Sequence, residues 1–146
     1  MTHTVRFEIP GKPFAKQRPR MTRQGRAYTP KATVSFESVV RQLAALHFSE
    51  PLRGPVHVSV CAVFEIPKSW SKARRDAAVD GFHTSRPDAD NIRKAILDGM
   101  NRIAYEDDSQ VASGFDQKIY GSEAKTIVEV TALHADAWHL RPQVRL

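Results

Sequence analysis

The alternation of apolar residues between Val56 and Ile66 is the feature that most constrains how this chain can fold. Every second position of the segment is apolar, so one face can be buried while the other stays more polar. This pattern is typical of a β-strand that has one face on a hydrophobic core. The single cysteine, Cys61, points to the other face of the predicted strand, and we interpret it as a structural residue.

A second segment, which begins at Ile92, has the period of an α-helix. Its apolar residues have the relative positions of one buried helical stripe: Ile92, Ala95, Ile96, Gly99, Met100 and Ile103. Gly99 lowers helix propensity, which suggests close packing at that position. Pro87 keeps the residue before it extended. We therefore expect Asp88 or Asp90 to be the N-cap of this helix.

The remaining patterns indicate an α+β fold. We expect a strand at Val5–Ile9, a helix from Pro30 to about His47 that is capped by Thr29, and a short helix after Ser71. The expected apolar positions of the helix from Pro30 are Val34, Val39, Val40, Leu43 and Leu46. Thr126–Leu133 alternates with two fairly apolar faces, as in a central strand or at a subunit interface. We predict one domain, residues 1–146, with a mixed β-sheet of about four strands, two long helices and one short helix.

The composition limits the function classes that are compatible with the chain. The 146 residues include 22 Lys and Arg against 16 Asp and Glu, a formal net charge of +6, which suggests a polyanionic partner such as nucleic acid. A single cysteine excludes an internal disulfide framework and a cysteine-based zinc site. The N-terminal residues do not have the pattern of a signal peptide, and we expect a cytoplasmic protein.

The positive charge is concentrated near the N-terminus. Gly11–Lys31 contains seven basic residues and no acidic residue, together with Phe14 and Tyr28. We predict an irregular loop or ribbon that lies against phosphates, although a solvated loop is the structural alternative. The predicted nucleic-acid contacts in this segment are Lys12, Lys16, Arg18, Arg20, Arg23 and Arg26.

Six of the 16 acidic residues lie within 21 positions: Asp88, Asp90, Asp98, Glu106, Asp107 and Asp108. A structural interpretation is available, because one aspartate can cap the helix and Asp90, Lys94 and Asp98 can form an ion-pair ladder on one helix face. A cap requires only one carboxylate, however, and adjacent acids repel unless a cation neutralises them.

If the strand expected after Asp108 runs back along the helix, the two acidic pairs could converge at the helix N-terminus. Clustered carboxylates on rigid elements suit Mg²⁺ or Mn²⁺. Such a metal ion would activate water and neutralise charge on a phosphate, and Lys94 could stabilise that charge.

The segment His83–Val111 combines three elements: an Asp-x-Asp-Asn sequence, a helix with a Lys-Ala pair, and an Asp-Asp pair before a strand. This combination resembles the signature of the RusA-type Holliday-junction resolvases. The sequence "IPKSWSKARR" at Ile66–Arg75 also looks like the corresponding part of phage-type members. The resemblance is strong over Ile66–Val111 and weaker over the N-terminal segments.

The resemblance implies a Mg²⁺-dependent homodimeric endonuclease that acts on branched DNA in recombination and repair, in a bacterial or phage setting. The implied metal ligands are Asp88, Asp90 and Asp108, with Asp107 as the alternative to Asp108, and Mn²⁺ is a potential substitute for Mg²⁺. The implied catalytic lysine is Lys94.

Several expectations complete the hypothesis. We interpret His83 as a phosphate contact or as a residue that supports the metal ligands. The expected dimer surfaces are Thr126–Leu133 and the helix Pro30–His47, and the tail His134–Leu146 has no assigned role. Two alternative functions remain open: a nucleic-acid-binding module without catalysis, and a metal nuclease for plain single-stranded or duplex DNA.

Overall fold

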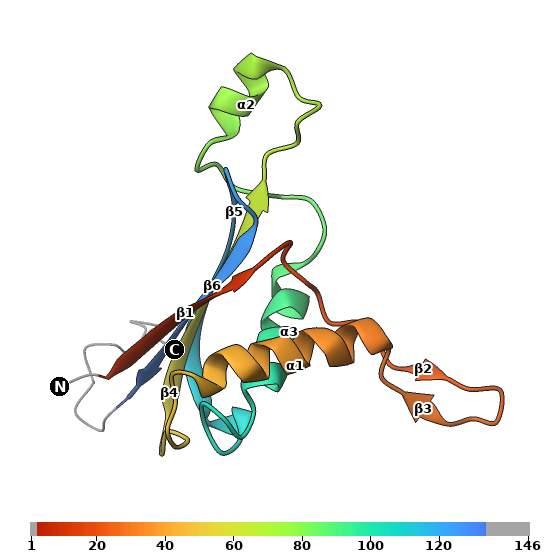
Figure 1. The fold of residues 1–146 in the computed structure, drawn as a ribbon, viewed down its shortest axis with the longest axis vertical. Helices are drawn as coiled ribbons and strands as arrows, with labels where there is room; N and C mark the ends of the chain where they lie inside the picture. Colours follow the sequence, from red (N-terminus) through yellow and green to blue (C-terminus); the bar gives the residue numbers. More distant parts are fainter. Residues whose placement is uncertain (1–2, 134–146) are drawn as a thin grey trace, which may run out of the picture.

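A mixed four-stranded sheet, in the order β1-β6-β4-β5, organises the chain in the computed structural model, which describes residues 3–133 (Figure 1). Its strands are β1 (Thr4–Pro10), β4 (Val56–Glu65), β5 (Val111–Gly121) and β6 (Lys125–Ala132). β6 pairs antiparallel with β1 and β4, whereas β4 pairs parallel with β5. The α+β class and the mixed four-stranded sheet predicted from the sequence are confirmed, and β6 is a central strand.

The alternation in β4 places its apolar side chains on the buried face of the sheet. Val56 and Val58 are fully buried, and Ala62 and Phe64 are almost so. Two long helices, α1 (Lys31–Ala45) and α3 (Ala89–Met100), join this face in one hydrophobic core. Each buried Val or Phe of the strand therefore contributes roughly 1.5–3 kcal/mol through the removal of apolar surface from water.

The helix predicted from the spacing after Ile92 is α3. The buried residues of α3 are the predicted ones, namely Ile92, Ala95, Ile96, Gly99 and Met100, while Ile103 lies beyond the helix end. The prediction of close packing at Gly99 is confirmed, because a Cβ atom there would lie 2.7 Å from Cβ of Val40 on α1. Gly99 therefore lets the two helices approach each other.

The apolar stripe predicted for the first long helix was correct only in part, since Val40 is buried and Leu43 packs against the core. Pro30, and not Thr29, is the N-cap of α1, and no side chain caps the helix. Three of the expected core residues, Val34, Val39 and Leu46, are exposed, whereas the buried residues of α1 are Thr33, Val40 and Ala44. The reason is that the Thr33 hydroxyl is hydrogen-bonded to Gln17, which allows a polar residue to occupy the core side of the helix.

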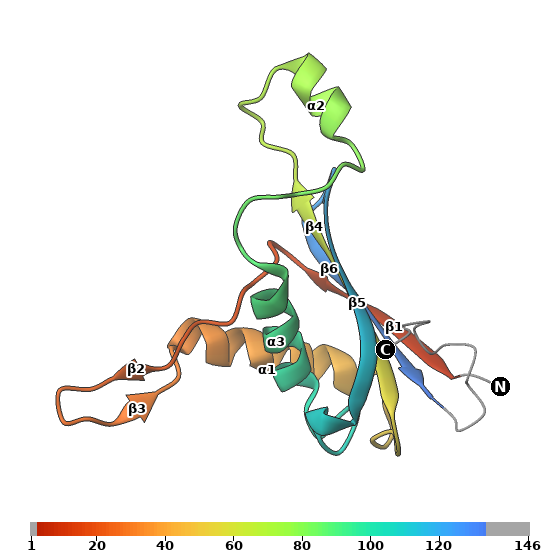
Figure 2. The same cartoon turned by 180° about the vertical axis from the view of Figure 1, so that it is seen from behind.

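Two segments project from this framework (Figures 1 and 2). The hairpin arm, residues 18–29, contains the short strands β2 (Arg20–Met21) and β3 (Ala27–Tyr28). The lobe, residues 67–82, contains α2 (Lys72–Ala78), which is the predicted short helix, and the Ser71 side chain caps it. No helix within residues 3–133 has the length and apolar character needed to cross a membrane.

Candidate functional site

The N-terminal end of α3 presents two carboxylates to solvent. Asp88 is the N-cap of α3, but its side chain makes no capping hydrogen bond, and Asp90 lies in the first turn. Both residues are exposed, and neither belongs to an ion pair within residues 3–133. A cap normally uses its carboxylate to bind a free backbone N–H group. The oxygens of Asp88 and Asp90 are therefore available to a ligand.

The ion-pair ladder along α3 does not form. Lys94 is exposed and has no ion-pair partner among the described residues, and Asp98 forms its ion pair with Lys16 instead. The structural interpretation of Asp90 and Lys94 thus loses its main support. Both side chains remain on the solvent-facing side of the helix.

Lys16 has an internal role, which differs from the predicted contact with nucleic acid. Its ammonium group pairs with Asp98 on α3 and with Glu37 on α1, the latter at 2.9 Å. Burial alone would lower the pKa of Lys16, but hydrogen bonds and charge from Asp98 and Glu37 outweigh it and raise this pKa. The backbone N–H of Lys16 also donates to the carbonyl of Asn91 at 2.9 Å. The basic N-terminal segment therefore runs directly beside the first turns of α3.

The second acidic pair lies at the short 3₁₀ helix η1 (Asp108–Gln110), just before β5. Asp107 caps this helix, and hydrogen bonds from Ser109 lower the pKa of the Asp107 carboxyl group. Asp108 is exposed and its carboxylate has no hydrogen-bond or ion-pair partner within residues 3–133. Burial, together with the charges of Asp108 and Asp98, raises the pKa of Tyr105. Of the two adjacent acids, Asp108 is the one whose oxygens are free.

The expectation that both acidic pairs converge at the α3 N-terminus was wrong for a single chain. β5 does run back along α3, since Asp116 in its middle binds Arg93 and Lys118 near its end reaches the segment before Asp88. The acids precede this strand, however, and are therefore left at the C-terminal end of α3. The 12 residues of α3 span about 18 Å. Within residues 3–133, no three His, Cys, Asp or Glu side chains form a group that could hold a metal ion.

Two basic residues that the sequence did not single out hold the α3 N-terminus in place. The Lys118 ammonium group donates to the carbonyls of Ser85 and Pro87, at 2.7 and 2.8 Å, on either side of Arg86. The Arg93 guanidinium group donates to the Val58 carbonyl and to Asp116, which ties α3 to the sheet. No local pattern indicates these roles, because each depends on partners more than 20 positions away in the chain.

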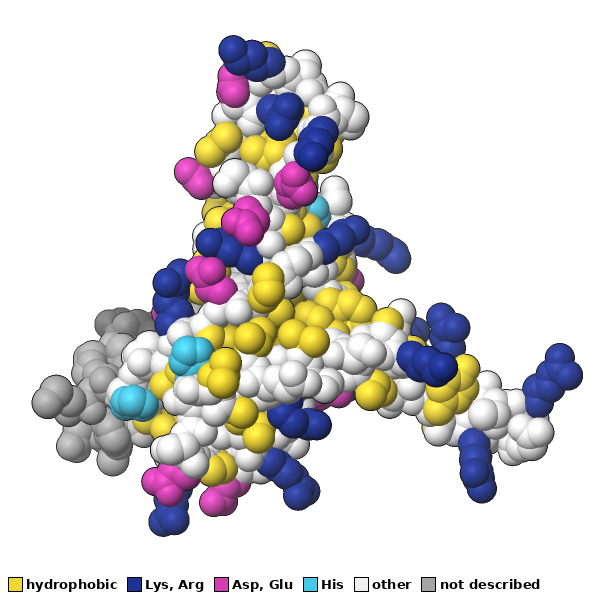
Figure 3. Space-filling model, in the orientation of Figure 1, with side chains coloured by type: hydrophobic (Ala, Val, Ile, Leu, Met, Phe, Trp, Pro, Cys, Tyr) yellow, Lys and Arg dark blue, Asp and Glu magenta, His cyan; other side chains and the backbone are white. Residues whose placement is uncertain are grey.

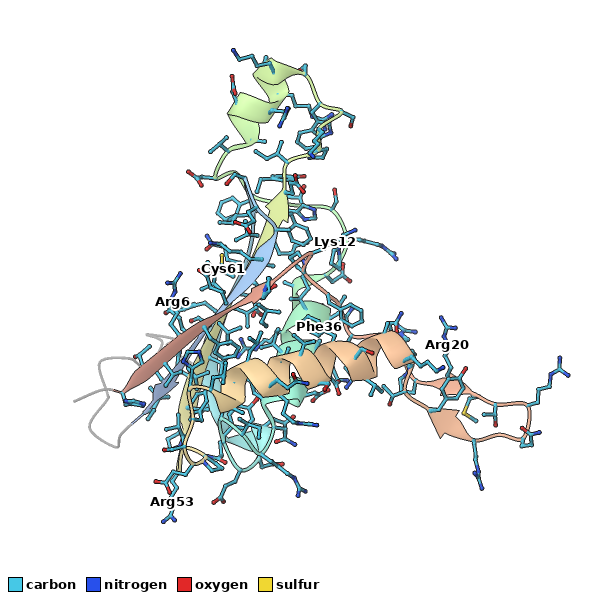
Figure 4. The ribbon with its side chains drawn as sticks, viewed as in Figure 1. Arg6, Lys12, Arg20, Phe36, Arg53 and Cys61 are labelled. Carbon is cyan, nitrogen blue, oxygen red and sulfur yellow. The ribbon has the colours of Figure 1, made fainter. Side chains whose placement is uncertain are left out.

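The other basic residues predicted to contact nucleic acid are exposed. Four of them belong to the hairpin arm, and Figure 4 shows the Arg20 side chain extending from it. These exposed residues are Lys12, Arg18, Arg20, Arg23 and Arg26, and none forms an ion pair with a described residue. Figure 3 shows the dark-blue Lys and Arg side chains spread along the arm, with no magenta carboxylate near its tip.

His83 lies in an aromatic stack. Its ring packs against Phe64 at a centroid distance of 3.7 Å and against Tyr120 at 5.1 Å. Burial, and then the positive charges of Lys118 and Lys12, lower the pKa of His83. Its Nδ1 atom is buried without a hydrogen-bond partner in the described part of the chain. This geometry gives His83 a packing role, and nothing in it supports the predicted phosphate contact.

Comparisons with known proteins identify the family of this chain. Residues 10–131 match the family described as endodeoxyribonuclease RusA. The chain is also 32% identical over 139 residues to an uncharacterized protein of Bacillus subtilis (strain 168), YqaN, a match that covers 90% of this chain and 98% of the relative. The match includes the basic segment, α3 with its free carboxylates, and η1. This chain therefore belongs to the RusA family of endodeoxyribonucleases.

Proposed function

We propose that this protein is a metal-dependent endonuclease that resolves four-way DNA junctions by hydrolysing a phosphodiester in each of two strands. One observation carries the proposal: a cationic chain exposes the unpartnered carboxylates of Asp88 and Asp90 beside its basic segment. Carboxylates and phosphates repel each other unless a cation lies between them. A divalent cation bound by the free carboxylates could also bind a DNA phosphate. Family membership supports the nuclease class.

The donor set suits Mg²⁺, with Mn²⁺ as a substitute. Asp88, Asp90 and Asp108 offer hard oxygen ligands that no described residue occupies. A divalent cation held there would supply an acidic water and charge neutralisation at the phosphate. The protein's own part is to orient the phosphate and to compensate its charge. Lys94, one turn after Asp90 on the same exposed face, is the group we assign to that compensation.

Because the two acidic groups lie at opposite ends of α3, we propose that a second copy of the chain completes each site. In a two-fold dimer with neighbouring α3 helices antiparallel, Asp88 and Asp90 of one copy would face Asp108 of the other. Two equivalent sites result, as two symmetric nicks in a four-way junction require. The absence of a three-residue metal group within residues 3–133 of one chain supports this arrangement.

The exposed side of α1, which lies in front of α3 in Figure 1, is a candidate for a contact between proteins other than the α3–α3 contact of the shared site. It presents Val34, Val39 and Leu46, and its only exposed charges are Lys31 and Arg41. Figure 3 shows few charged side chains over the middle of this face. Depletion of charge with exposed apolar side chains is typical of protein interfaces. The outer side of β6 is a weaker candidate for such an interface, because it includes the charged residue Glu129.

We assign duplex binding to the basic segment. Lys12 and the arginines of the hairpin arm are exposed and without ion-pair partners in the described region, so they can contact backbone phosphates. The root of this segment lies against α3 through Lys16. Duplex bound by the arm would therefore lie near the carboxylates.

The test is cleavage of a labelled mobile four-way junction and of a linear duplex with Mg²⁺, by the wild type, Asp90→Asn and Asp76→Asn. Asp76 is an exposed aspartate on α2 without an ion-pair partner in residues 3–133, and serves as the matched control. We expect paired nicks in the junction, little cleavage of the duplex, no cleavage by Asp90→Asn and normal cleavage by Asp76→Asn. Equal cleavage of both substrates would favour a general metal nuclease, and binding without any cleavage would favour a binding module.

A further inference from the structure

The lobe buries little of itself. None of the residues of α2 is buried, and both views show the lobe extending beyond the end of the sheet (Figures 1 and 2). Packing against the core therefore does not explain why this segment is held in a defined position. Instead, interactions at the base of the lobe hold it in place.

A column of stacked side chains joins the lobe to the sheet. The Arg74 guanidinium group lies 3.7 Å from the centroid of the Trp70 ring. Trp70 then contacts Tyr120 edge-on at 5.4 Å, and Tyr120 contacts His83 at 5.1 Å. His83 stacks on Phe64, whose side chain belongs to the hydrophobic core. The column thus lies on the helix-bearing face of the sheet.

The base of this column is also tied to the candidate site. The backbone N–H groups of His83 and Tyr120 donate to the carbonyls of Lys118 and Gly81. Lys118 in turn holds the carbonyls of Ser85 and Pro87, immediately before Asp88. The positions of Trp70 and Arg74 relative to the α3 N-terminus are therefore set by a continuous series of interactions.

The charges of the lobe differ in their surroundings. Lys72 and Arg75 line an open groove together with the lobe's carboxylates, Asp76 and Asp80, and with Glu65 and Glu123. Lys68 and Arg74 do not line this groove. None of the four cations forms an ion pair with a described residue. A cation without a carboxylate partner, held in place by an aromatic ring, is suited to bind an anion.

We propose that the lobe is a second DNA-binding element, in which Arg74 and Lys68 contact backbone phosphates of duplex that extends past α3 on the side away from the hairpin arm. This inference rests on the proposed function, and it adds a DNA contact that the basic N-terminal segment does not provide. The DNA between the hairpin arm and the lobe would then pass the α3 N-terminus, so that one of its backbone phosphates lies there. The Trp70 ring orders Arg74 before DNA binds, which lowers the entropy cost of binding.

The experiment measures the salt dependence of binding to a fluorescent four-way junction, by anisotropy in the presence of EDTA. The test variant is Lys68→Gln/Arg74→Gln, and the control is Lys72→Gln/Arg75→Gln, which removes the same charge from the groove of the same lobe. In the proposed dimer each of the two copies loses two phosphate contacts, so we expect the test variant to reduce the slope of log K against log salt by about 3.6, at about 0.9 for each phosphate that is no longer neutralised. The control should change it by less than about 0.9. Equal slopes for wild type and test variant, or equal reductions in both variants, would overturn the proposal.

Loss of Arg74 could also disorder the lobe by removing the stacking on Trp70. Arg74→Lys separates the two effects, because lysine keeps the charge but not the planar stack. Arg74→Gln, measured alone, is the reference for this comparison. We expect Arg74→Lys to retain the wild-type slope, whereas a reduction equal to that of Arg74→Gln would assign Arg74 a structural role and overturn the proposal. A wild type that binds no DNA would instead reject the proposed function itself, and with it this inference. Binding that depends on the hairpin arm but not on the lobe would reject this inference alone.

Discussion

The aspartates of α3 illustrate how the role of a carboxylate depends on what its oxygens already bind. Asp90 and Asp98 are eight positions apart on one side of the helix, yet Asp98 is neutralised by Lys16 and Asp90 has no partner in the described residues. Lys16 is 82 positions away from Asp98 in the chain. A sequence pattern therefore identifies both residues as candidates but does not separate the structural one from the free one.

This difference predicts opposite effects for two similar substitutions. Asp90→Asn should abolish cleavage, retain junction binding and leave stability unchanged or slightly higher, because it removes one of several clustered negative charges. Asp98→Asn should leave the proposed metal ligands unchanged but lower the free energy of unfolding by about 1–3 kcal/mol, since a charged hydrogen bond to Lys16 is weakened. Urea unfolding and single-turnover cleavage of both variants test this. A stable, inactive Asp98→Asn protein would contradict the assignment.

The half-buried position of His83 leads us to expect that the free energy of unfolding depends on pH. Burial lowers its pKa in the folded protein, so below about pH 6.5 the unfolded chain binds the proton more readily. The resulting loss of stability begins as the pH falls through the unfolded pKa and is absent above it. His83→Phe keeps the stack on Phe64 and removes the titrating group. We expect its gain in unfolding free energy over the wild type to be larger at pH 5 than at pH 8.

Denaturant unfolding at the two pH values measures this gain, and His47→Phe is the control. His47 is exposed and also stacks on a phenylalanine, Phe7. The His83 assignment is wrong if both variants show the same dependence on pH.

At the scale of elements, hydrophobic periodicity was sufficient to predict the buried face of an element that packs on the core with one apolar face. β4 and α3 each bury the residues that their spacing predicts. For α1 only Val40 and Leu43 of the expected stripe reach the core. The buried position Thr33 was missed because it is a polar residue whose hydroxyl is satisfied by Gln17. The hairpin arm has little hydrophobic pattern at all, so its composition predicted an irregular basic ribbon and nothing more specific.

The packing of α1 against α3 gives a test at this scale. Gly99→Ala would place a methyl group against Val40 and should lower the free energy of unfolding by about 1–3 kcal/mol. Val40→Ala makes room for that methyl group. The double variant should therefore be more stable than the sum of the single effects predicts, as denaturant unfolding would show. Strict additivity would mean that the two helices are farther apart at Gly99 than the 2.7 Å clearance implies.

The hairpin arm should supply affinity without contributing to the chemical step. Arg20→Gln/Arg23→Gln should reduce the slope of log K against log salt by about 0.9 for each backbone phosphate that these arginines neutralise. The control is Arg6→Gln/Arg53→Gln, since Figure 4 shows Arg6 and Arg53 far from Arg20. Anisotropy titrations over a range of salt concentrations give the slopes. Equal slopes for the two double variants would place the DNA-binding surface elsewhere.

At the scale of the whole molecule, the sequence identified the acidic residues as candidate metal ligands but not their arrangement. The signature suggested one cluster, whereas the fold separates Asp88 and Asp90 from Asp108 by the length of α3. That separation follows from the direction of β5, which a local pattern does not encode. If two copies complete one site, as we propose, light scattering should report about twice the chain mass of 16.4 kDa.

Complementation between two inactive variants tests the shared site most directly. Asp90→Asn and Asp108→Asn chains with different affinity tags are co-expressed, and the mixed dimer is purified through both tags. One of its two sites then carries both substitutions and the other carries neither, so we predict that each pure variant is inactive while the mixed dimer nicks one strand of the junction. A mixed dimer as inactive as its parents would show that each site lies within one chain, and would contradict the account.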